Sequence, residues 1–67
     1  MIIGVIESFD EHRGDGHLRS DDGVDFYFHC VAIADGSRSI PPGVRAEGRR
    51  AVGHLGHDEA VSVRALD

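Results

Sequence analysis

The chain has 67 residues, a formal net charge of −5 at pH 7 and a single cysteine. This length allows one small domain, which buries only about 60% of the surface that its unfolded chain exposes. One cysteine excludes an internal disulfide and fits a reducing compartment. No apolar run approaches the ~20 residues that span a membrane, and Met1-Ile2-Ile3 lacks the basic flank and cleavage site of a signal peptide. We therefore expect one cytoplasmic domain over residues 1–67.

The acidic residues are concentrated in the first half of the chain. Residues 1–35 contain eight acidic residues and two arginines, a balance of −6, whereas residues 36–67 contain five arginines and four acidic residues, a balance of +1. Proteins that bind nucleic acid through its phosphates are usually basic, at least locally, so this charge argues against a general affinity for polyanions. All seven basic residues are arginine, which stacks on bases better than lysine does, although a bias in residue usage is the simpler explanation.

Three strands are predicted in the first half of the chain. Residues 1–9 are rich in strand-forming side chains, and Gly4 within them indicates a bend or bulge. After a glycine-containing connection, residues 17–20 form a short second strand with Leu18 pointing inward. Asp21-Asp22-Gly23 is typical of a hairpin turn, and it leads into a third strand over residues 25–30.

The second half of the chain predicts one helical turn and two further strands. The expected elements are the helical turn at 31–34, a loop at 35–43 anchored by Ile40, a strand at 44–52, a Gly/His loop at 53–58 and a last strand at 59–66. In the last strand, Val61, Val63 and Ala65 are expected on one face. No segment has a sustained helical period, so the chain is predicted to be all-β. Five short strands in this length favour a closed or nearly closed five-stranded barrel.

The third strand, Asp25-Phe26-Tyr27-Phe28-His29-Cys30, holds three of the four aromatic side chains. Because successive side chains of a strand point to opposite faces, Phe26 and Phe28 are expected in the core, with Tyr27 and His29 on the other face. A phenol and an imidazole on one face suit a flat partner such as a nucleobase. The alternative is a buried strand whose outer face is merely polar. Cys30 is expected to be a small buried side chain rather than a reactive thiol.

The order of motifs resembles the cold-shock domain, a five-stranded OB-type barrel that binds single-stranded RNA and DNA. The segment Gly4–Asp10 matches Gly-x-Val-Lys-Trp-Phe-Asn of that family, and Arg13–Leu18 matches its first ribonucleoprotein motif, Lys-Gly-Phe-Gly-Phe-Ile. The Asp-Asp-Gly hairpin follows, and Asp25–Ile33 matches the second motif, Asp-Val-Phe-Val-His-Phe-Ser-Ala-Ile. Ser39–Gly43 resembles the entry into strand four, and Ala60–Val63 resembles the closing Ala-Ala-Asn-Val.

Several ligand-facing positions of the family are altered in this chain. The lysine and tryptophan of the family's first strand are replaced by Glu7 and Ser8, and its aromatic residues stand at the positions of Asp15, His17, Cys30 and Ser37. Stacking of a base on an aromatic ring contributes about 1–3 kcal/mol, so these losses predict weaker binding than in typical members.

The resemblance implies a nucleic-acid site made of Arg13, His17, Tyr27 and His29. Tyr27 and His29 are expected to stack on bases, Arg13 to contact phosphate, and His17 to provide a planar substitute for phenylalanine. The alternatives are a salt bridge from Arg13 to Asp15 or Glu11, and an exposed His17 without a role. Two charged histidines would attract phosphate, so binding could depend on pH.

The sequence leaves two alternatives to nucleic-acid binding. The barrel could have lost its nucleic acid and could use the altered face for a protein partner or a homodimer. His54, His57 and Asp58 have a spacing that could hold a metal, but a third convincing ligand is missing. No motif sets a nucleophile beside a base. We expect no metal, no cofactor and no enzymatic activity.

Overall fold

The computed structural model describes residues 1–53 and 56–66. Within these residues there are five strands and one short 3-10 helix, with no helix long and apolar enough to cross a bilayer. The elements are β1 (Ile2–Asp10), β2 (Asp15–Ser20), β3 (Asp25–His29), η1 (Cys30–Ala32), β4 (Arg45–Val52) and β5 (Asp58–Ala65). The predicted strands and helical turn are confirmed, with boundaries displaced by one or two residues.

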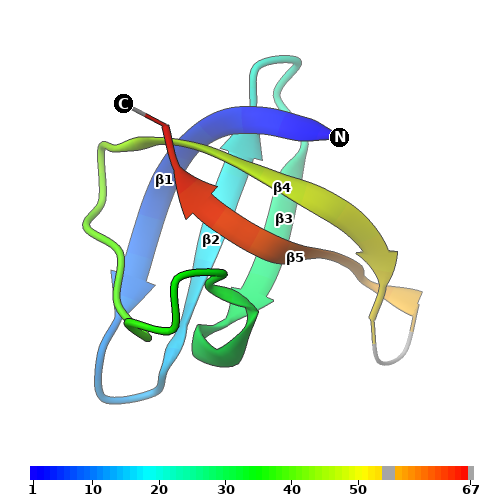
Figure 1. The fold of residues 1–67 in the computed structure, drawn as a ribbon. Helices are drawn as coiled ribbons and strands as arrows, with labels where there is room; N and C mark the ends of the chain where they lie inside the picture. The colour runs from blue at the N-terminus through cyan, green and yellow to red at the C-terminus, as the bar shows by residue number, and fades with distance from the viewer. Residues whose placement is uncertain (54–55, 67) are drawn as a thin grey trace.

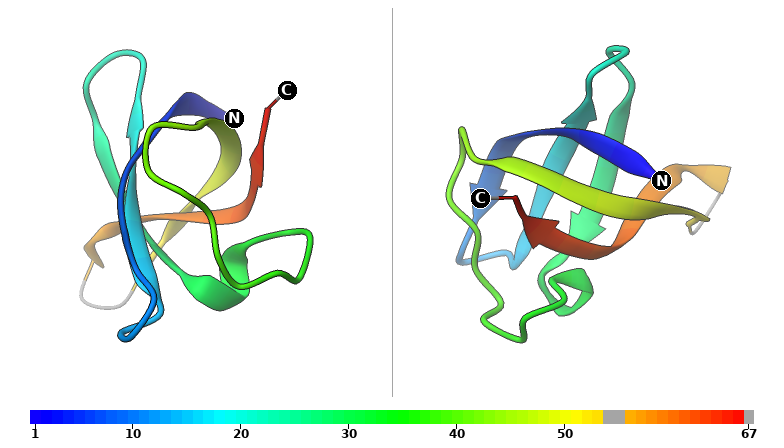
Figure 2. Two further views of the ribbon diagram at one scale, coloured as in Figure 1. Left: turned by 90° about the vertical axis from the view of Figure 1, so that its left-hand side faces the viewer. Right: turned by 45° about the horizontal axis from the view of Figure 1, so that its top comes forward.

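The five strands close into a barrel in the spatial order β1-β2-β3-β5-β4, and β4 pairs back onto β1. β1, β2 and β3 form an antiparallel meander, and the antiparallel pair β4–β5 crosses it (Figure 1). Closure depends on a short parallel contact between Tyr27 of β3 and Glu59 of β5, extended by the isolated bridge between Ile33 and Val63. The long loop between η1 and β4 runs outside the strands (Figure 2). The all-β, five-stranded OB-type barrel expected from the sequence is confirmed.

Apolar side chains from every strand fill the barrel. The buried residues are Ile2, Ile6, Leu18, Phe26, Phe28, Ile33, Ile40, Ala46, Ala60 and Val63. Phe28 is fully buried, and its ring stacks on that of Phe9 with centroids 5.9 Å apart and 15° between the planes. The predicted inward orientation of Leu18, Phe26 and Phe28 is therefore confirmed, as is the anchoring of the long loop by Ile40.

Two glycines allow the meander strands to lie close together. A Cβ atom at Gly4 would overlap the backbone carbonyl of Arg19, and a Cβ atom at Gly16 would overlap that of Ser8. The predicted irregularity in β1 exists, but the pairing of β1 with β2 shifts between Ile6 and Ser8, after Gly4. Gly4 and Val5 are the residues at which β1 pairs with both of its neighbours.

The last strand departs from the expected alternation. Val63 is fully buried, whereas Val61 and Ala65 are exposed, and Ala60 supplies the other inward side chain. Ser62, between the two valines, adopts a positive φ of 54°, and the register with β4 shifts opposite this point. Such a β-bulge places one extra residue in the strand and reverses the facing of the residues on one side of it. The prediction that Val61, Val63 and Ala65 share a face was therefore wrong.

Candidate nucleic-acid interface

The outer surface of β2 and β3 carries three of the four predicted site residues. Side chains alternate along a strand, so the odd-numbered residues point away from the core when their even-numbered neighbours Leu18, Phe26 and Phe28 are buried. The register of the two strands arranges these neighbours as three cross-strand pairs: Asp15 with His29, His17 with Tyr27, and Arg19 with Asp25. We call this surface the outer face. It brings His17, Tyr27 and His29 together as the sequence predicted.

The rings of His17 and Tyr27 meet edge to face. Their centroids are 5.9 Å apart and their planes are inclined by 75°. A base that lies flat on one ring cannot also lie flat on the other, because stacking requires nearly parallel planes. The pair can therefore support one base and bound its edge, but it cannot sandwich two bases in a continuous stack.

His29 combines an exposed position with a structural role. Its Nδ1 atom accepts a hydrogen bond from the backbone N–H of Val31 at 3.3 Å, so His29 caps the start of η1. The neutral imidazole must then carry its proton on Nε2, because Nδ1 acts as the acceptor. This contact orients the ring while its outer edge remains exposed to solvent.

Arg13 lies in the connection between β1 and β2, beside Asp15 at the start of β2. Its Nη2 atom is 3.2 Å from Oδ2 of Asp15, so one of the two salt bridges considered as alternatives is present. The side chain of Arg13 is 72% exposed, whereas that of Asp15 is only 16% exposed. The hydroxyl of Tyr27 also donates to Oδ2 of Asp15, at 3.2 Å.

Carboxylates also lie beside His17 and Arg19 on this surface. Nδ1 of His17 lies 3.0 Å from Oδ2 of Asp25, and Nη1 of Arg19 lies 3.0 Å from Oε2 of Glu7 on β1. These partners are about half exposed, so the pairs are weak and screened by salt. With histidine neutral, three carboxylates (Glu7, Asp15 and Asp25) stand against two arginines (Arg13 and Arg19), so this surface is not basic.

Partial burial of Tyr27 raises the pKa of its hydroxyl. The nearby carboxylate of Asp15 raises this pKa further, through its negative charge and through the hydrogen bond that it accepts. The charge of Glu59, the β5 residue paired with Tyr27, acts in the same direction. Tyr27 is therefore neutral at physiological pH, and its hydroxyl keeps the proton that it donates to Asp15.

The two carboxylates that organise the outer face were absent from the predicted site. Asp15 holds Arg13 and Tyr27, and Asp25 holds His17. The predicted β2–β3 hairpin could have identified both aspartates. Its register pairs His17 with Tyr27, which puts Asp15 diagonally opposite Tyr27 and Asp25 diagonally opposite His17.

Three further residues singled out in the sequence, Ser8, Cys30 and Ser37, have defined neighbours in the structure. Ser8 of β1 pairs with His17 across the first two strands, and it places a small hydroxyl beside the outer face. Cys30 is half-buried, rather than buried as expected, and its Sγ atom lies near Nδ1 of His29 at 3.7 Å. Ser37 in the long loop donates to the carbonyl of Ser39, so it stabilises the loop locally.

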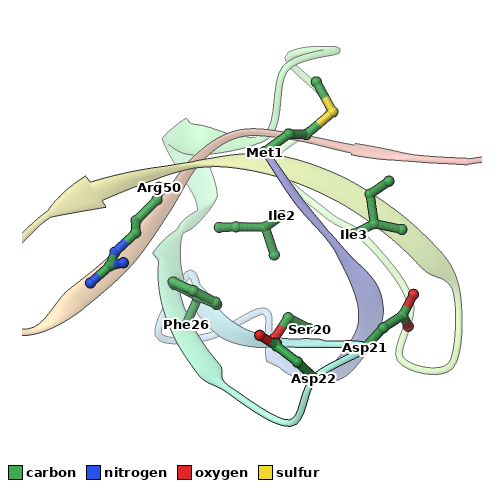
Figure 3. A pocket seen from close by; sticks show the side chains of 8 residues that line it. All are labelled: Met1, Ile2, Ile3, Ser20, Asp21, Asp22, Phe26 and Arg50. Atoms are coloured by element: carbon green, nitrogen blue, oxygen red, sulfur yellow. The ribbon is translucent and has the colours of Figure 1, made fainter.

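A separate depression of about 490 Å³ lies at the other end of β2 from Arg13 and Asp15. Figure 3 shows Ile2 and Phe26 between the opposed charges of Arg50 on one side and Asp22 on the other. It shares no lining residue with the predicted site, and we therefore keep it apart from the candidate interface.

The weak metal hypothesis gains no support from the residues that the structure describes. Residues 1–53 and 56–66 contain no group of three or more side chains suited to holding a metal ion. His54, one member of the proposed trio, lies outside the described residues.

Comparisons with known proteins agree with this geometry. No family model matches the sequence, and no curated protein matches it. Among solved structures, the chain is similar to drosophila Unr CSD456, with a TM-score of 0.78 and 25% sequence identity over 98% of the chain. The barrel has the fold of a cold-shock domain. The chain spans 26% of the length of the Unr chain, and the barrel fold agrees with the resemblance in motif order.

Proposed function

We propose that this cold-shock domain binds single-stranded RNA or DNA through its outer face, more weakly than typical members. Cold-shock neighbours suggest nucleic-acid binding at the level of the family. The observation that carries the proposal is the clustering of His17, Tyr27 and His29 on one exposed surface of the barrel. Tyr27 and His29 would stack on bases, His17 would bound the edge of a base on Tyr27, and Arg13 would contact a phosphate.

Weak binding follows from the charge and the ring count. Only one tyrosine and two imidazoles occupy the face, and stacking contributes about 1–3 kcal/mol per base. Each phosphate contact must also compete with a carboxylate that already holds the cation. The same reasoning predicts a steep loss of binding as salt rises, because phosphate contacts release counterions.

The test is a titration of backbone amide NMR shifts with a short pyrimidine-rich single strand, first at low and then at moderate salt. Salt-sensitive shifts are expected at Arg13, His17, Tyr27 and His29. Tyr27→Ala and His29→Ala should weaken binding, while Tyr27→Phe, which keeps the ring, should retain most of it. His57→Ala is the matched control, because His57 is an exposed histidine in the connection between β4 and β5 and is not on the outer face. Unchanged binding in Tyr27→Ala and His29→Ala would assign the ligand to another surface.

The second candidate is a protein-interaction or self-associating module. It is favoured by the internal ion pairs of the outer face and by the net charge of −5, since both oppose a polyanion. Salt separates the two functions, because an apolar protein interface weakens far less with salt than phosphate contacts do. For either function we propose a single cytoplasmic domain over residues 1–67, without enzymatic activity.

A further inference from the structure

Two hydrogen-bond donors converge on one oxygen of the outer face. Nη2 of Arg13 and the hydroxyl of Tyr27 each lie 3.2 Å from Oδ2 of Asp15. The donors come from different elements, the β1–β2 connection and β3, and the acceptor belongs to β2. A guanidinium and a hydroxyl aimed at one point form a binding position for an anionic oxygen.

We propose that Asp15 is an internal competitor for nucleic acid: its carboxylate pairs with Arg13 in place of a phosphate and keeps a negative charge beside the site. The proposal rests on the proposed function and deepens it by naming what limits affinity. The cold-shock family that this chain resembles has an aromatic side chain at the position of Asp15. An aspartate there removes a ring on which a base could stack, and it adds a carboxylate that can pair with Arg13 as a phosphate would.

A phosphate can replace Asp15 as the partner of Arg13, because the Arg13 side chain lies mostly in solvent. The Arg13 side chain is 72% exposed, and exposed ion pairs contribute little to stability. Asp15 is held more firmly, since its side chain is 16% exposed and also accepts from Tyr27. Arg13 can therefore leave Asp15 for a phosphate, but the carboxylate remains beside the site and repels the incoming charge.

The experiment compares Asp15→Asn with the wild type, using the same pyrimidine-rich single strand at low salt. The substitution keeps an acceptor for Tyr27 but removes the negative charge and loosens Arg13. Affinity should rise about fivefold, the size expected for one nearby charge partly screened by solvent. The slope of log K against log salt should steepen by about 0.7, the value for one released counterion on a single strand, because no freed Asp15 carboxylate takes up a cation when Arg13 moves to the phosphate.

Two further variants make the comparison specific. Asp22→Asn makes the same change in net charge in the β2–β3 turn, at the other end of β2, and should raise affinity less than twofold. Arg13→Gln combined with Asp15→Asn should lose the gain in affinity and the steeper slope, because the freed guanidinium is then absent. Unchanged core amide shifts verify that each variant folds.

The outcomes separate this inference from the proposed function. Equal gains in Asp15→Asn and Asp22→Asn, with wild-type binding present, would overturn the role of Asp15 and leave nucleic-acid binding intact. A gain that survives removal of Arg13 would also overturn it. If neither the wild type nor Asp15→Asn binds at low salt, the proposed function fails and the inference fails with it.

Discussion

The hydroxyl of Tyr27 lies 3.2 Å from Oδ2 of Asp15, across two paired strands of the barrel. The contact is diagonal, since Tyr27 pairs directly with His17 and Asp15 pairs with His29. It links the only tyrosine of the chain to the carboxylate that also holds Arg13. The pKa of the Tyr27 hydroxyl therefore depends on the charge of Asp15 in the candidate interface.

We expect the pKa of Tyr27 to lie above its ordinary value of about 10, first because of burial and then because of Asp15. A raised pKa means that the folded state holds the proton more tightly. The resulting stability is complete below the unfolded pKa and is lost as pH rises through the folded pKa. Asp15→Asn should lower the pKa toward the ordinary value without reaching it, since burial remains.

Ultraviolet absorbance measures this titration directly, because the chain contains one tyrosine and no tryptophan. The unfolded chain in denaturant gives the reference value. Identical titrations in the wild type and in Asp15→Asn would show that the two side chains do not interact in solution.

Phe28→Ala should be among the most destabilising single substitutions. Phe28 is fully buried and stacks on Phe9, and truncation of a buried phenylalanine costs about 3–5 kcal/mol. A small domain of this length has a total stability of about 3–10 kcal/mol, so the variant stands at the edge of unfolding.

Urea denaturation measures the loss, and Phe28→Leu provides a companion that keeps part of the apolar volume. Val52→Ala is the control, because Val52 is 81% exposed and should change stability by less than about 0.5 kcal/mol. A Phe28→Ala protein as stable as Val52→Ala would contradict the packing of the barrel.

Gly4→Ala should destabilise the barrel far more than Gly48→Ala does. A Cβ atom at Gly4 overlaps the backbone of Arg19, which cannot move without separating β1 from β2, and such overpacking costs about 1–3 kcal/mol or more. At Gly48, the Cβ atom would be 3.3 Å from its nearest neighbour, so a small adjustment suffices. Thermal unfolding of both variants gives the comparison, and equal melting temperatures would contradict the close approach at Gly4.

The Asp21–Arg45 pair should contribute to stability only above acidic pH. The guanidinium of Arg45 donates to both carboxylate oxygens of Asp21, at 2.9 and 3.1 Å, and this hydrogen bonding lowers the pKa of Asp21 from 3.8. A lowered folded pKa gives stability that is present above the unfolded pKa and is lost as pH falls through the folded value.

Thermal unfolding between neutral pH and pH 2 tests the pair. Asp21→Asn and Arg45→Gln should each remove the same part of the decline that the wild type shows below pH 3.8. Both groups are exposed, so added salt should shrink the difference. If both variants lose melting temperature with falling pH in the same way as the wild type, this contact does not contribute to stability.

The strands, the hairpin and the two faces of β3 can be predicted from the amino-acid sequence alone. Phe26 and Phe28 point inward, and Tyr27 and His29 point outward, because side chains alternate along any strand whatever surrounds it. The turn after β2 is equally local, since the glycine at its end adopts a positive φ of 90°. Regular features that depend on near neighbours in the chain could therefore be predicted.

Features that depend on segments far apart in the chain become visible only in the folded barrel. The bulge at Ser62 turned Val61 outward because β5 must change register against β4, and no pattern within the strand records that partner. Closure through Tyr27 and Glu59 likewise needs strands separated by the whole long loop. In the same way, the alternation of β2 turned Asp15 outward, but only the folded hairpin brought its carboxylate to Tyr27 and Arg13, because the length and direction of the side chains determine which charges meet.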